Sequence, residues 1–571
     1  MSNAMFFSRQ LALRHVLTFL AFLFIALALV GGWRGYSPVP FWDMWGSYLG
    51  FIDHSASDDW SPWFAQHNEH RIVLARLFFW ADVHLFKGAG LFLIVANYLL
   101  VAFAALLYCQ ILREATAPSK RTTEFHALSL LVVCALFFWS QQESLIWGFQ
   151  SQFFLAQSLP LAALYMLYRS RQGGLGGFVL ACLLGILSAG TMANGVLALP
   201  LMVAYALLTR QGALRSGTLA ALAALVLFAY FRDYVPPSEH GSLLLALGSP
   251  LKFASYVVYF LGSPFYFAFG TKALGRLAAL LGGIFLLVSS LRFAWQLVRN
   301  RRHADLQLVL LAYIAYIVGS AIGTAGGRLV FGVSQALTER YTTSALMAWA
   351  ALLVLYAPTL LALQEPRRRR VWGGLAVLAL LMLAYQFKAL HSKSDELFDR
   401  SVAALAIELR IKDLAEIRHV GPSTNVVDFT VQASDKQRSI FGLYPYRDAR
   451  AHMGTSFAPI ALPDCRGAML SSETVEGDER YLRVRGWLYE PIGDAMPQVI
   501  RMLAVDGKQV GYALGGAAWS EAAAAQQKAP RRSGFRGYLA SDQAGTTITL
   551  RGEEPNGPIC QLKVTVPYTQ H

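Results

Sequence analysis

The chain reads Phe41-Trp42-Asp43-Met44-Trp45 shortly after its first apolar run, and His67-Asn68-Glu69-His70-Arg71 a little further on. Both motifs lie in a polar, aromatic-rich stretch, residues 34–88, whereas most of the remaining sequence up to residue 390 consists of long apolar runs. Ionisable side chains next to a membrane are costly, so a concentration of them in one loop indicates a functional site.

The composition excludes an ordinary soluble protein, because 55% of the residues are hydrophobic and only 15% are charged. A bilayer core of roughly 30 Å requires about 20 apolar residues per helix. The apolar runs predict about eleven transmembrane helices, at residues 16–33, 89–112, 126–140, 153–168, 176–192, 196–209, 217–231, 276–298, 305–325, 342–363 and 371–387. For residues 252–270 we expect an interfacial or partly re-entrant helix, because one more span would reverse every later basic loop.

The net charge of +14 follows the expected membrane topology. Basic residues gather in every second short loop, from Arg9 and Arg14 near the start to the run Arg367–Arg370. Cytoplasmic loops carry this excess of Lys and Arg, so we expect a cytoplasmic N-terminus and an external C-terminal part. The charge therefore indicates contact with membrane lipids and gives no support to a nucleic-acid partner.

The sequence divides into segments of different character. Residues 1–4 resemble an expression scar, and residues 5–390 form the predicted transmembrane domain with its long first external loop, 34–88. Residues 391–460 predict an external amphipathic helix and linker, and residues 461–571, with short alternating runs and a turn signal at Asp506-Gly507, predict an external β-sandwich-like domain. Such a domain either binds carbohydrate or serves packing alone.

Two of the five cysteines, Cys465 and Cys560, lie near the two ends of the predicted β domain. In an oxidising compartment this placement favours a disulfide, although two free buried thiols remain the alternative.

Polar residues recur at the loops predicted on the outer face. A carboxylate there can deprotonate an acceptor hydroxyl if burial raises its pKa, arginine can hold a phosphate, and aromatic rings can stack on sugars. This inventory favours a transfer reaction on a lipid-linked, phosphate-bearing substrate. The candidate substrate-binding residues are Trp42, His67, Asn68, Glu69, His70, Arg71, Gln142, Glu143, Trp147, Gln150 and Asn194.

The architecture of residues 5–390, with the motifs Phe41-Trp42-Asp43 and Glu339-Arg340-Tyr341, resembles the GT-C superfamily of integral membrane glycosyltransferases. The resemblance implies a polyprenyl-phosphate-linked sugar donor, direct displacement at the anomeric carbon with inversion, and Asp43 as the general base. It also implies that Arg340, beside Tyr341, holds the donor phosphate, with Arg328 and Lys252 as further candidates. Many members carry a second acidic residue where this chain has Met44, so a paired acid would come from Glu69 or Glu143.

These expectations extend to location and partners. The resemblance places the protein in a bacterial inner membrane, with its C-terminal domain in the periplasm, acting on a glycan or lipid acceptor of the cell envelope. No cofactor is required by the sequence, and a divalent cation is compatible with it. His67 and His70 could share one face, but no third metal ligand is evident, so we expect no protein-built metal site.

Three other functions compete with this hypothesis. A transporter or flippase would place ionisable groups at the bilayer midplane and often show internal repeats, neither of which is evident here. An external acyltransferase or ligase would use histidine, and His67, His70 and His240 keep it open. A scaffold for the β domain would not explain the polar residues gathered on one face.

Overall fold

The computed structural model describes residues 2–55, 59–117, 122–300, 304–364, 366–422, 425–519 and 529–567. The chain divides into two compact units that are not continuous in sequence. The helical unit comprises Met1–Tyr36, Trp63–Phe78 and Leu93–His391, and the mixed unit comprises Ser37–Pro62, Phe79–Phe92 and Ser392–His571.

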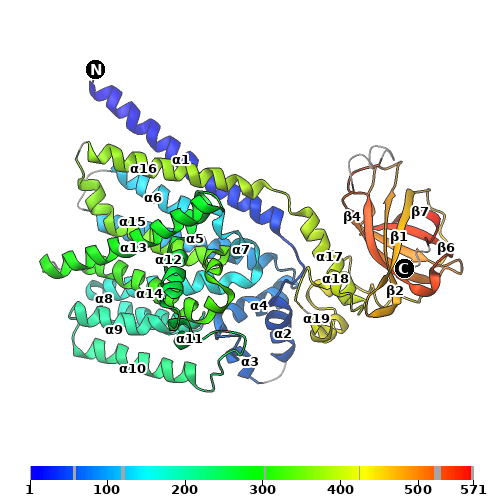
Figure 1. The fold of residues 1–571 in the computed structure, drawn as a ribbon, viewed down its shortest axis with the longest axis horizontal. Helices are drawn as coiled ribbons and strands as arrows, with labels where there is room; N and C mark the ends of the chain where they lie inside the picture. The colour runs from blue at the N-terminus through cyan, green and yellow to red at the C-terminus, as the bar shows by residue number, and fades with distance from the viewer. Residues whose placement is uncertain are drawn as a thin grey trace. The chain divides into compact units, whose positions relative to one another are not determined.

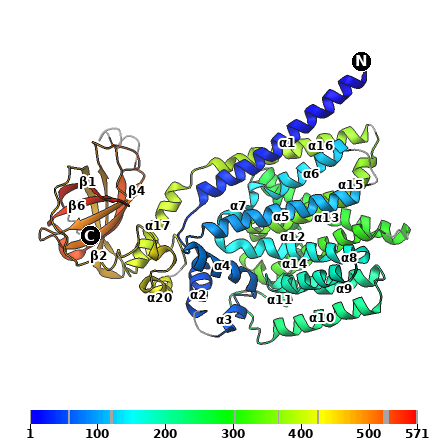
Figure 2. The ribbon, with the colours of Figure 1, turned by 180° about the vertical axis from the view of Figure 1, so that it is seen from behind.

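Long apolar helices build the helical unit (Figure 1), and helices α8, α9 and α10 lie side by side in it, as do α1 and α16 (Figure 2). The long helices are α1 (Ser2–Gly35), α5 (Leu91–Thr116), α6 (Thr122–Leu136), α8 (Ser151–Ala189), α9 (Ala198–Leu208), α10 (Ala213–Phe231), α12 (Pro250–Ala268), α13 (Ala273–Asn300), α14 (Asp305–Arg328), α15 (Glu339–Ala362) and α16 (Arg367–Gln386). Shorter elements connect them, namely α4 (Val73–Phe86), α7 (Gln142–Ile146), α11 (Leu243–Leu247) and η4 (Ala193–Leu197).

Within the described ranges, eight helices are long and apolar enough to cross a membrane. They are Arg14–Gly35, Leu91–Thr116, Thr123–Ile146, Ala213–Phe231, Ala273–Arg299, Asp305–Phe331, Glu339–Ala362 and Arg367–Leu390. The predicted count of eleven is therefore not confirmed. The spans predicted at 153–168 and 176–192 both fall on α8, which Gly174 interrupts between them with φ +76°. The apolar helices at the predicted spans 176–192 and 196–209, Gly174–Ala189 and Ala193–Leu208, are only 10–17 residues long.

Helix α12 covers the segment for which we expect an interfacial or re-entrant helix, and it is not among the eight. It packs against α13 and also contacts α14, α15 and α16. Glycine permits the close approach of α13, because a Cβ at Gly262 would lie 1.8 Å from the Ala279 carbonyl oxygen. Its position relative to a membrane surface stays a prediction.

Side chains that donate to the backbone of other helices hold the bundle together. The hydroxyl of Tyr108 donates to Met347 O at 2.6 Å, and that of Tyr316 donates to Ala156 O at 2.6 Å. The amide of Gln386, fully buried near the end of α16, donates to Phe24 O and Phe137 O, each at 3.0 Å. Such hydrogen bonds between helices stabilise membrane bundles, where apolar burial alone gives little specificity.

The mixed unit combines the first-loop segment 37–62 with the C-terminal third of the chain. Its helical elements include η1 (Met44–Leu49), α2 (Gly50–His54), α17 (Ser394–Glu408), α18 (Leu414–Ile417), α19 (Asn425–Phe429) and α20 (Val431–Asp435), and α3 (Ser61–Phe64) follows the first-loop segment. The carbonyl oxygen of Val420 accepts from the backbone N–H of Trp42 at 2.7 Å and from the indole N–H of Trp45 at 3.2 Å. Arg438 pairs with Asp53 at 2.7 Å, so both segments fold as one body.

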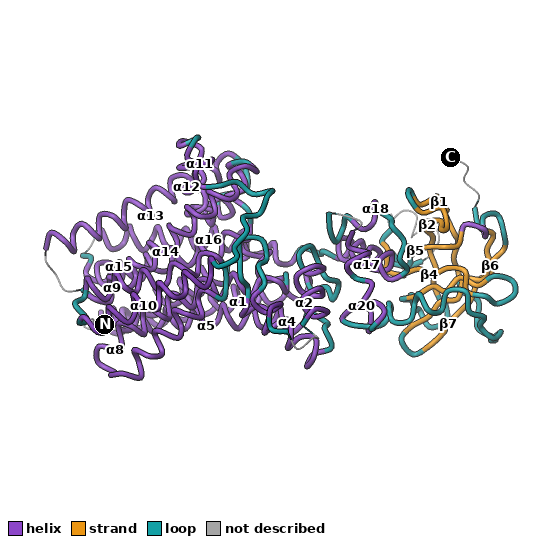
Figure 3. The backbone as a smooth tube through the Cα atoms, turned by 90° about the horizontal axis from the view of Figure 1, so that it is seen from below, coloured by secondary structure: helices purple, strands orange, loops and turns teal. Residues whose placement is uncertain are grey.

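The C-terminal strands form one antiparallel sheet, which curls into a half-barrel (Figure 3). Its order is β1-β2-β5-β4-β3-β6-β7. The two packed layers expected of a sandwich are not confirmed, because all seven strands belong to this single sheet. The strands are β1 (Arg466–Val475), β2 (Asp478–Tyr489), β3 (Val499–Leu503), β4 (Gln509–Ala517), β5 (Gly534–Ala540), β6 (Thr547–Glu554) and β7 (Gly557–Thr565).

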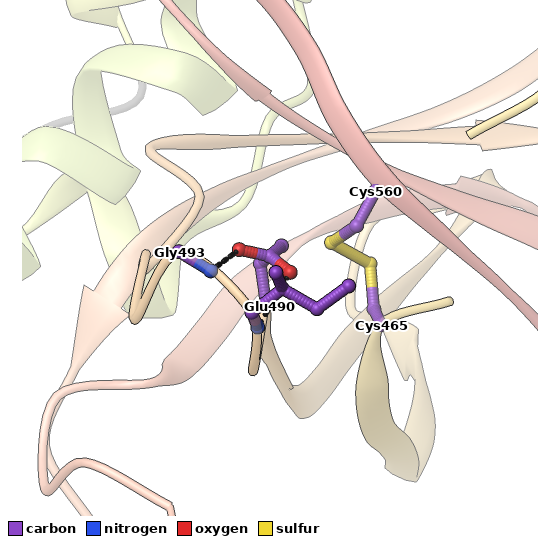
Figure 4. The surroundings of a disulfide bond; sticks show 5 residues. Cys465, Glu490, Gly493 and Cys560 are labelled. Carbon is purple, nitrogen blue, oxygen red and sulfur yellow. Dashed lines mark hydrogen bonds between the residues drawn. A yellow bond between two sulfur atoms is a disulfide. The ribbon is translucent and has the colours of Figure 1, made fainter. Parts of the chain in front are cut away.

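The predicted disulfide between Cys465 and Cys560 is confirmed (Figure 4). Cys560 lies in β7 and Cys465 immediately precedes β1, so the bond joins the two outermost strands of the sheet. Next to it, the carboxylate of Glu490 accepts the backbone N–H groups of Ile492 and Gly493. An open sheet edge exposes unpaired backbone groups, and this closure protects both edges at once.

A row of polar side chains crosses the sheet and meets the helical segment 392–460. Arg483, Tyr538, Tyr512 and Arg501 lie directly opposite one another on β2, β5, β4 and β3, and therefore share one face. Asp413, only 1% exposed, accepts from Arg483 at 2.6 Å and from the Tyr538 hydroxyl at 2.9 Å. The charged pair is buried but hydrogen-bonded from two sides, as a buried carboxylate requires.

We expect the double variant Cys465→Ser/Cys560→Ser to destabilise the mixed unit by about 4 kcal/mol, because the bond closes a loop of 95 residues in the unfolded chain. Thermal unfolding of the full-length protein in detergent micelles measures this loss. Reductant should lower the melting temperature of the wild type to that of the variant and leave the variant unchanged. Equal melting temperatures for the two oxidised proteins would contradict the prediction.

Glu408 in α17 makes stability depend on pH. Burial raises the pKa of Glu408 from 4.5 to about 7, although its carboxylate accepts from Ser434 at 2.8 Å. Between these two pH values the unfolded chain releases a proton that the folded protein keeps, so stability falls as pH rises through this window. Glu408→Gln removes this titration and keeps an acceptor for Ser434.

The variant Glu408→Gln should therefore match the wild type near pH 4.5 and exceed its stability by up to about 3 kcal/mol at pH 8. Melting temperatures measured from pH 5 to pH 8 test this. Glu396→Gln, on the exposed side of the same helix, is the matched control and should show no such divergence. A wild-type–variant difference that stays constant with pH would rule out Glu408 as the titrating group.

Candidate functional site

A tight turn presents the acidic residue of the motif at positions 67–71. The backbone N–H of His67 donates to His70 O at 2.7 Å, and the N–H of His70 donates to His67 O at 2.8 Å. Asn68 has φ +48°, a left-handed conformation that asparagine tolerates better than most residues. The two central residues of the turn, Asn68 and Glu69, therefore point away from the closing hydrogen bonds.

Arg71, a predicted substrate-binding residue, anchors this turn. Its guanidinium donates to Phe64 O at 2.7 Å, Tyr230 O at 2.9 Å and Arg232 O at 2.7 Å. Arg76 continues the pattern by donating to Trp63 O and Ala65 O. The interactions of Arg71 are thus structural, and contact with a substrate stays a prediction.

The Glu69 carboxylate lies among three basic side chains. Its Oε1 is in close contact with His240 Nδ1, and its Oε2 lies 3.5 Å from Arg328 Nη2 and 3.9 Å from His70 Nε2. Burial opposes ionisation of Glu69, but the positive potential of His70, Arg328 and His240 outweighs it, and the pKa of Glu69 is lowered. Glu69 is therefore a carboxylate at neutral pH.

His70 is neutral under the same conditions. Burial lowers the pKa of His70 to about 4. Its Nδ1 accepts the backbone N–H of Ala193 at 3.1 Å, which requires that this nitrogen carry no proton. The remaining proton therefore sits on Nε2, the nitrogen closer to Glu69.

A cavity of about 460 Å³ opens beside this cluster within the helical unit. It is lined by the turn, α8, η4, α14 and α15, so segments far apart in the sequence meet there. Six residues that the sequence analysis singled out line it: Glu69, His70, Asn194, Arg328, Arg340 and Tyr341.

Gln142 and Glu143, in α7, contact the start of α15. Glu143 Oε1 is 3.3 Å from Arg340 Nε, and the amide of Gln142 donates to Glu339. Glu143 thus positions Arg340, and Gln142 binds the preceding residue, Glu339. Neither of these two predicted substrate-binding residues lines the cavity.

The other predicted residues lie elsewhere. Trp147 and Gln150 are buried in the segment between α7 and α8, where the Trp147 carbonyl accepts from Asn97, and the ring of His67 packs edge-on against Phe149. Asn68 is exposed within the turn, and Lys252 is exposed at the start of α12. Asp43 and the half-exposed Trp42 belong to the mixed unit, where Asp43 directly precedes η1. The catalytic assignment of Asp43 stays a prediction.

The sequence analysis missed the residues that make room for the cavity. Gly319, Gly323 and Gly327 lie four residues apart on α14, and they line the cavity together with Ser320. A Cβ at Gly323 would meet no atom within 4 Å. The spacing Gly319-x₃-Gly323-x₃-Gly327 was the available signal, because small residues at this interval leave a groove along a helix.

Gln157 on α8 was also missed, since a single glutamine in an apolar run carries no recognisable pattern. As to metal binding, no three His, Cys, Asp or Glu side chains cluster suitably in the part of the chain that the structure describes.

Comparisons with known proteins provide no further assignment. No known protein family, curated protein sequence or solved structure matches this chain.

Proposed function

We propose that the protein is a membrane glycosyltransferase that moves a sugar from a polyprenyl-phosphate carrier to a hydroxyl acceptor. One observation carries the proposal: a single cavity combines the ionised carboxylate of Glu69 with the guanidinium groups of Arg328 and Arg340. A carboxylate can accept a proton from an attacking hydroxyl, while arginine can stabilise a phosphate that leaves.

The reaction balances with these groups alone. The acceptor oxygen forms a bond to the anomeric carbon of the sugar, and the bond from that carbon to the phosphate oxygen breaks. The electron pair of the broken bond stays on the phosphate, and the acceptor proton passes to the carboxylate. Attack from the side opposite the phosphate inverts the configuration of the sugar.

Arg340 is the better placed phosphate ligand. Its Nε is buried and lies 3.3 Å from Glu143, but it has no hydrogen-bond partner among the described residues. The ion pair with Glu143 orients the guanidinium of Arg340, which lines the cavity and can donate charge-assisted hydrogen bonds to a phosphate oxygen. Arg328 already lies next to Glu69, and its guanidinium would contribute to binding the same phosphate.

Two carboxylates compete for the role of general base. The resemblance to GT-C enzymes implies Asp43. Glu69 lines the cavity beside the two arginines, and we therefore assign it as the base, although its lowered pKa makes it a weaker proton acceptor than a carboxylate with the raised pKa expected from the sequence. The proposal places the reaction at the outer face of a bacterial inner membrane, with an envelope glycan or lipid as the acceptor.

The first test is binding of undecaprenyl phosphate to the full-length protein in nanodiscs. Arg340→Ala should weaken binding by about 10- to 100-fold, the value of one or more charge-assisted hydrogen bonds. Lys252→Ala is the matched control, because Lys252 is exposed and lies outside the cavity lining, and its affinity should equal that of the wild type. Wild-type protein without saturable binding would refute the lipid-linked donor and favour an acyltransferase or ligase.

The second test separates the two carboxylates by isosteric replacement. Glu69→Gln should reduce the release of sugar from an undecaprenyl-phosphate donor by about 100-fold or more, because it removes the proton acceptor. Donor binding should change by only a few-fold. Asp43→Asn is the parallel variant. A larger loss of sugar release in Asp43→Asn than in Glu69→Gln would identify Asp43 as the base, and the proposed reaction would stay the same. Binding without any turnover would instead support a transporter or flippase.

A further inference from the structure

In one wall of the cavity, formed by Asn194, Ser320 and Gly323, the hydrogen bonds determine which atoms donate and which accept. The hydroxyl of Ser320 donates to Tyr316 O at 2.9 Å, within its own helix. Its lone pairs are thus left to accept, and they accept the amide N–H of Asn194 at 3.0 Å. This arrangement orients the Asn194 amide, because the opposite orientation would place its oxygen against a hydroxyl oxygen with no proton to share.

The oxygen of the Asn194 amide consequently takes no part in this hydrogen bond. It is buried and has no hydrogen-bond partner among the described residues, and Asn194 is one of the residues that line the cavity. Gln157, whose side chain is 2% exposed, has a second such oxygen and also lines the cavity. Gln157 also borders a void of about 10 Å³ on its other side, so Asn194 carries the argument and Gln157 supports it. Both leftover atoms are acceptors, and both require a donor.

One cation of the cavity, Arg328, lies further along the same helix, and the other, Arg340, lies on α15. Arg328 follows Ser320 by eight residues, which corresponds to about 12 Å of helix rise. The cavity therefore has one end that attracts an anion and another that attracts hydrogen-bond donors. Gly323 lies between these ends, and its missing side chain keeps the space beside Ser320 open.

We propose that the wall of Asn194, Ser320 and Gly323 selects a neutral, hydroxyl-bearing sugar and rejects an acidic one. This inference rests on the proposed function, because it presumes that a sugar phosphate occupies the cavity with its phosphate at the arginines. Sugar hydroxyls donate to the two leftover oxygens. A sugar carboxylate has only acceptor oxygens. Two acceptors that face each other without a shared proton repel, so the wall disfavours an acidic sugar.

The test measures three probes on the full-length protein in nanodiscs: undecaprenyl phosphate, and the same carrier bearing glucose or glucuronic acid. The wild type should bind the glucose form at least tenfold more tightly than the glucuronic acid form. Asn194→Ala should lose at least tenfold in affinity for the glucose form and keep its affinity for the bare carrier. Retained binding of the bare carrier also shows that the variant folds.

Gly323 provides a matched pair of variants. Gly323→Ala adds one methyl group into open space and should change binding of the glucose form by less than threefold. Gly323→Leu fills the space and should reduce that binding by at least tenfold, again without affecting the bare carrier.

The outcomes separate the two proposals. Equal affinity of the wild type for the glucose and glucuronic acid forms overturns the selectivity, and so do Asn194→Ala and Gly323→Leu variants that bind all probes like the wild type. In both cases the proposed function survives. A wild type that binds no form of the carrier overturns both proposals.

Discussion

Polar groups inside an apolar bundle must find partners without water, and the helical unit is built around this requirement. Each helix satisfies its own backbone groups, and buried side-chain donors find carbonyl oxygens of neighbouring helices. Tyrosine hydroxyls do this between α5 and α15 and between α14 and α8. Gln386 does it where α1, α6 and α16 meet, and there its amide oxygen also accepts the backbone N–H of Trp139 at 2.8 Å.

The same requirement explains how a polar loop borders the bundle without unravelling. Arg71 and Arg76 donate to backbone carbonyl oxygens, so charge-assisted hydrogen bonds hold the turn that carries Glu69. Among the described residues that line the cavity, several buried polar atoms have no such partner. Asn194, Gln157 and Arg340 all line the cavity, and each has a buried polar atom without a hydrogen-bond partner among the described residues, as occurs at sites that bind a ligand.

Apolar length, charge bias and cysteine placement predicted the helical membrane architecture, the β structure of the C-terminal part and the disulfide. The number of spans is not confirmed: eight helices meet the length and hydropathy expected of a span within the described residues, and the apolar helices Gly174–Ala189 and Ala193–Leu208 are shorter. Strand order was also out of reach, since alternation predicts strands but not which of them pair. For the site, residue type placed Glu69, Arg328 and Arg340 among the candidates. It could not show that Arg71 faces carbonyl oxygens, nor that Gly323 leaves a space, because both depend on what stands opposite in three dimensions.

The discontinuous make-up of the mixed unit has a consequence for biosynthesis. Residues 37–62 leave the ribosome early, yet Val420 and Arg438, which bind Trp42, Trp45 and Asp53, are made more than 350 residues later. During translation the segment 37–62 therefore lacks its partners while the intervening helices are synthesised. Its folding can be completed only when the last third of the chain has been made, so a nascent chain that stalls before residue 420 cannot assemble the segment that contains Asp43.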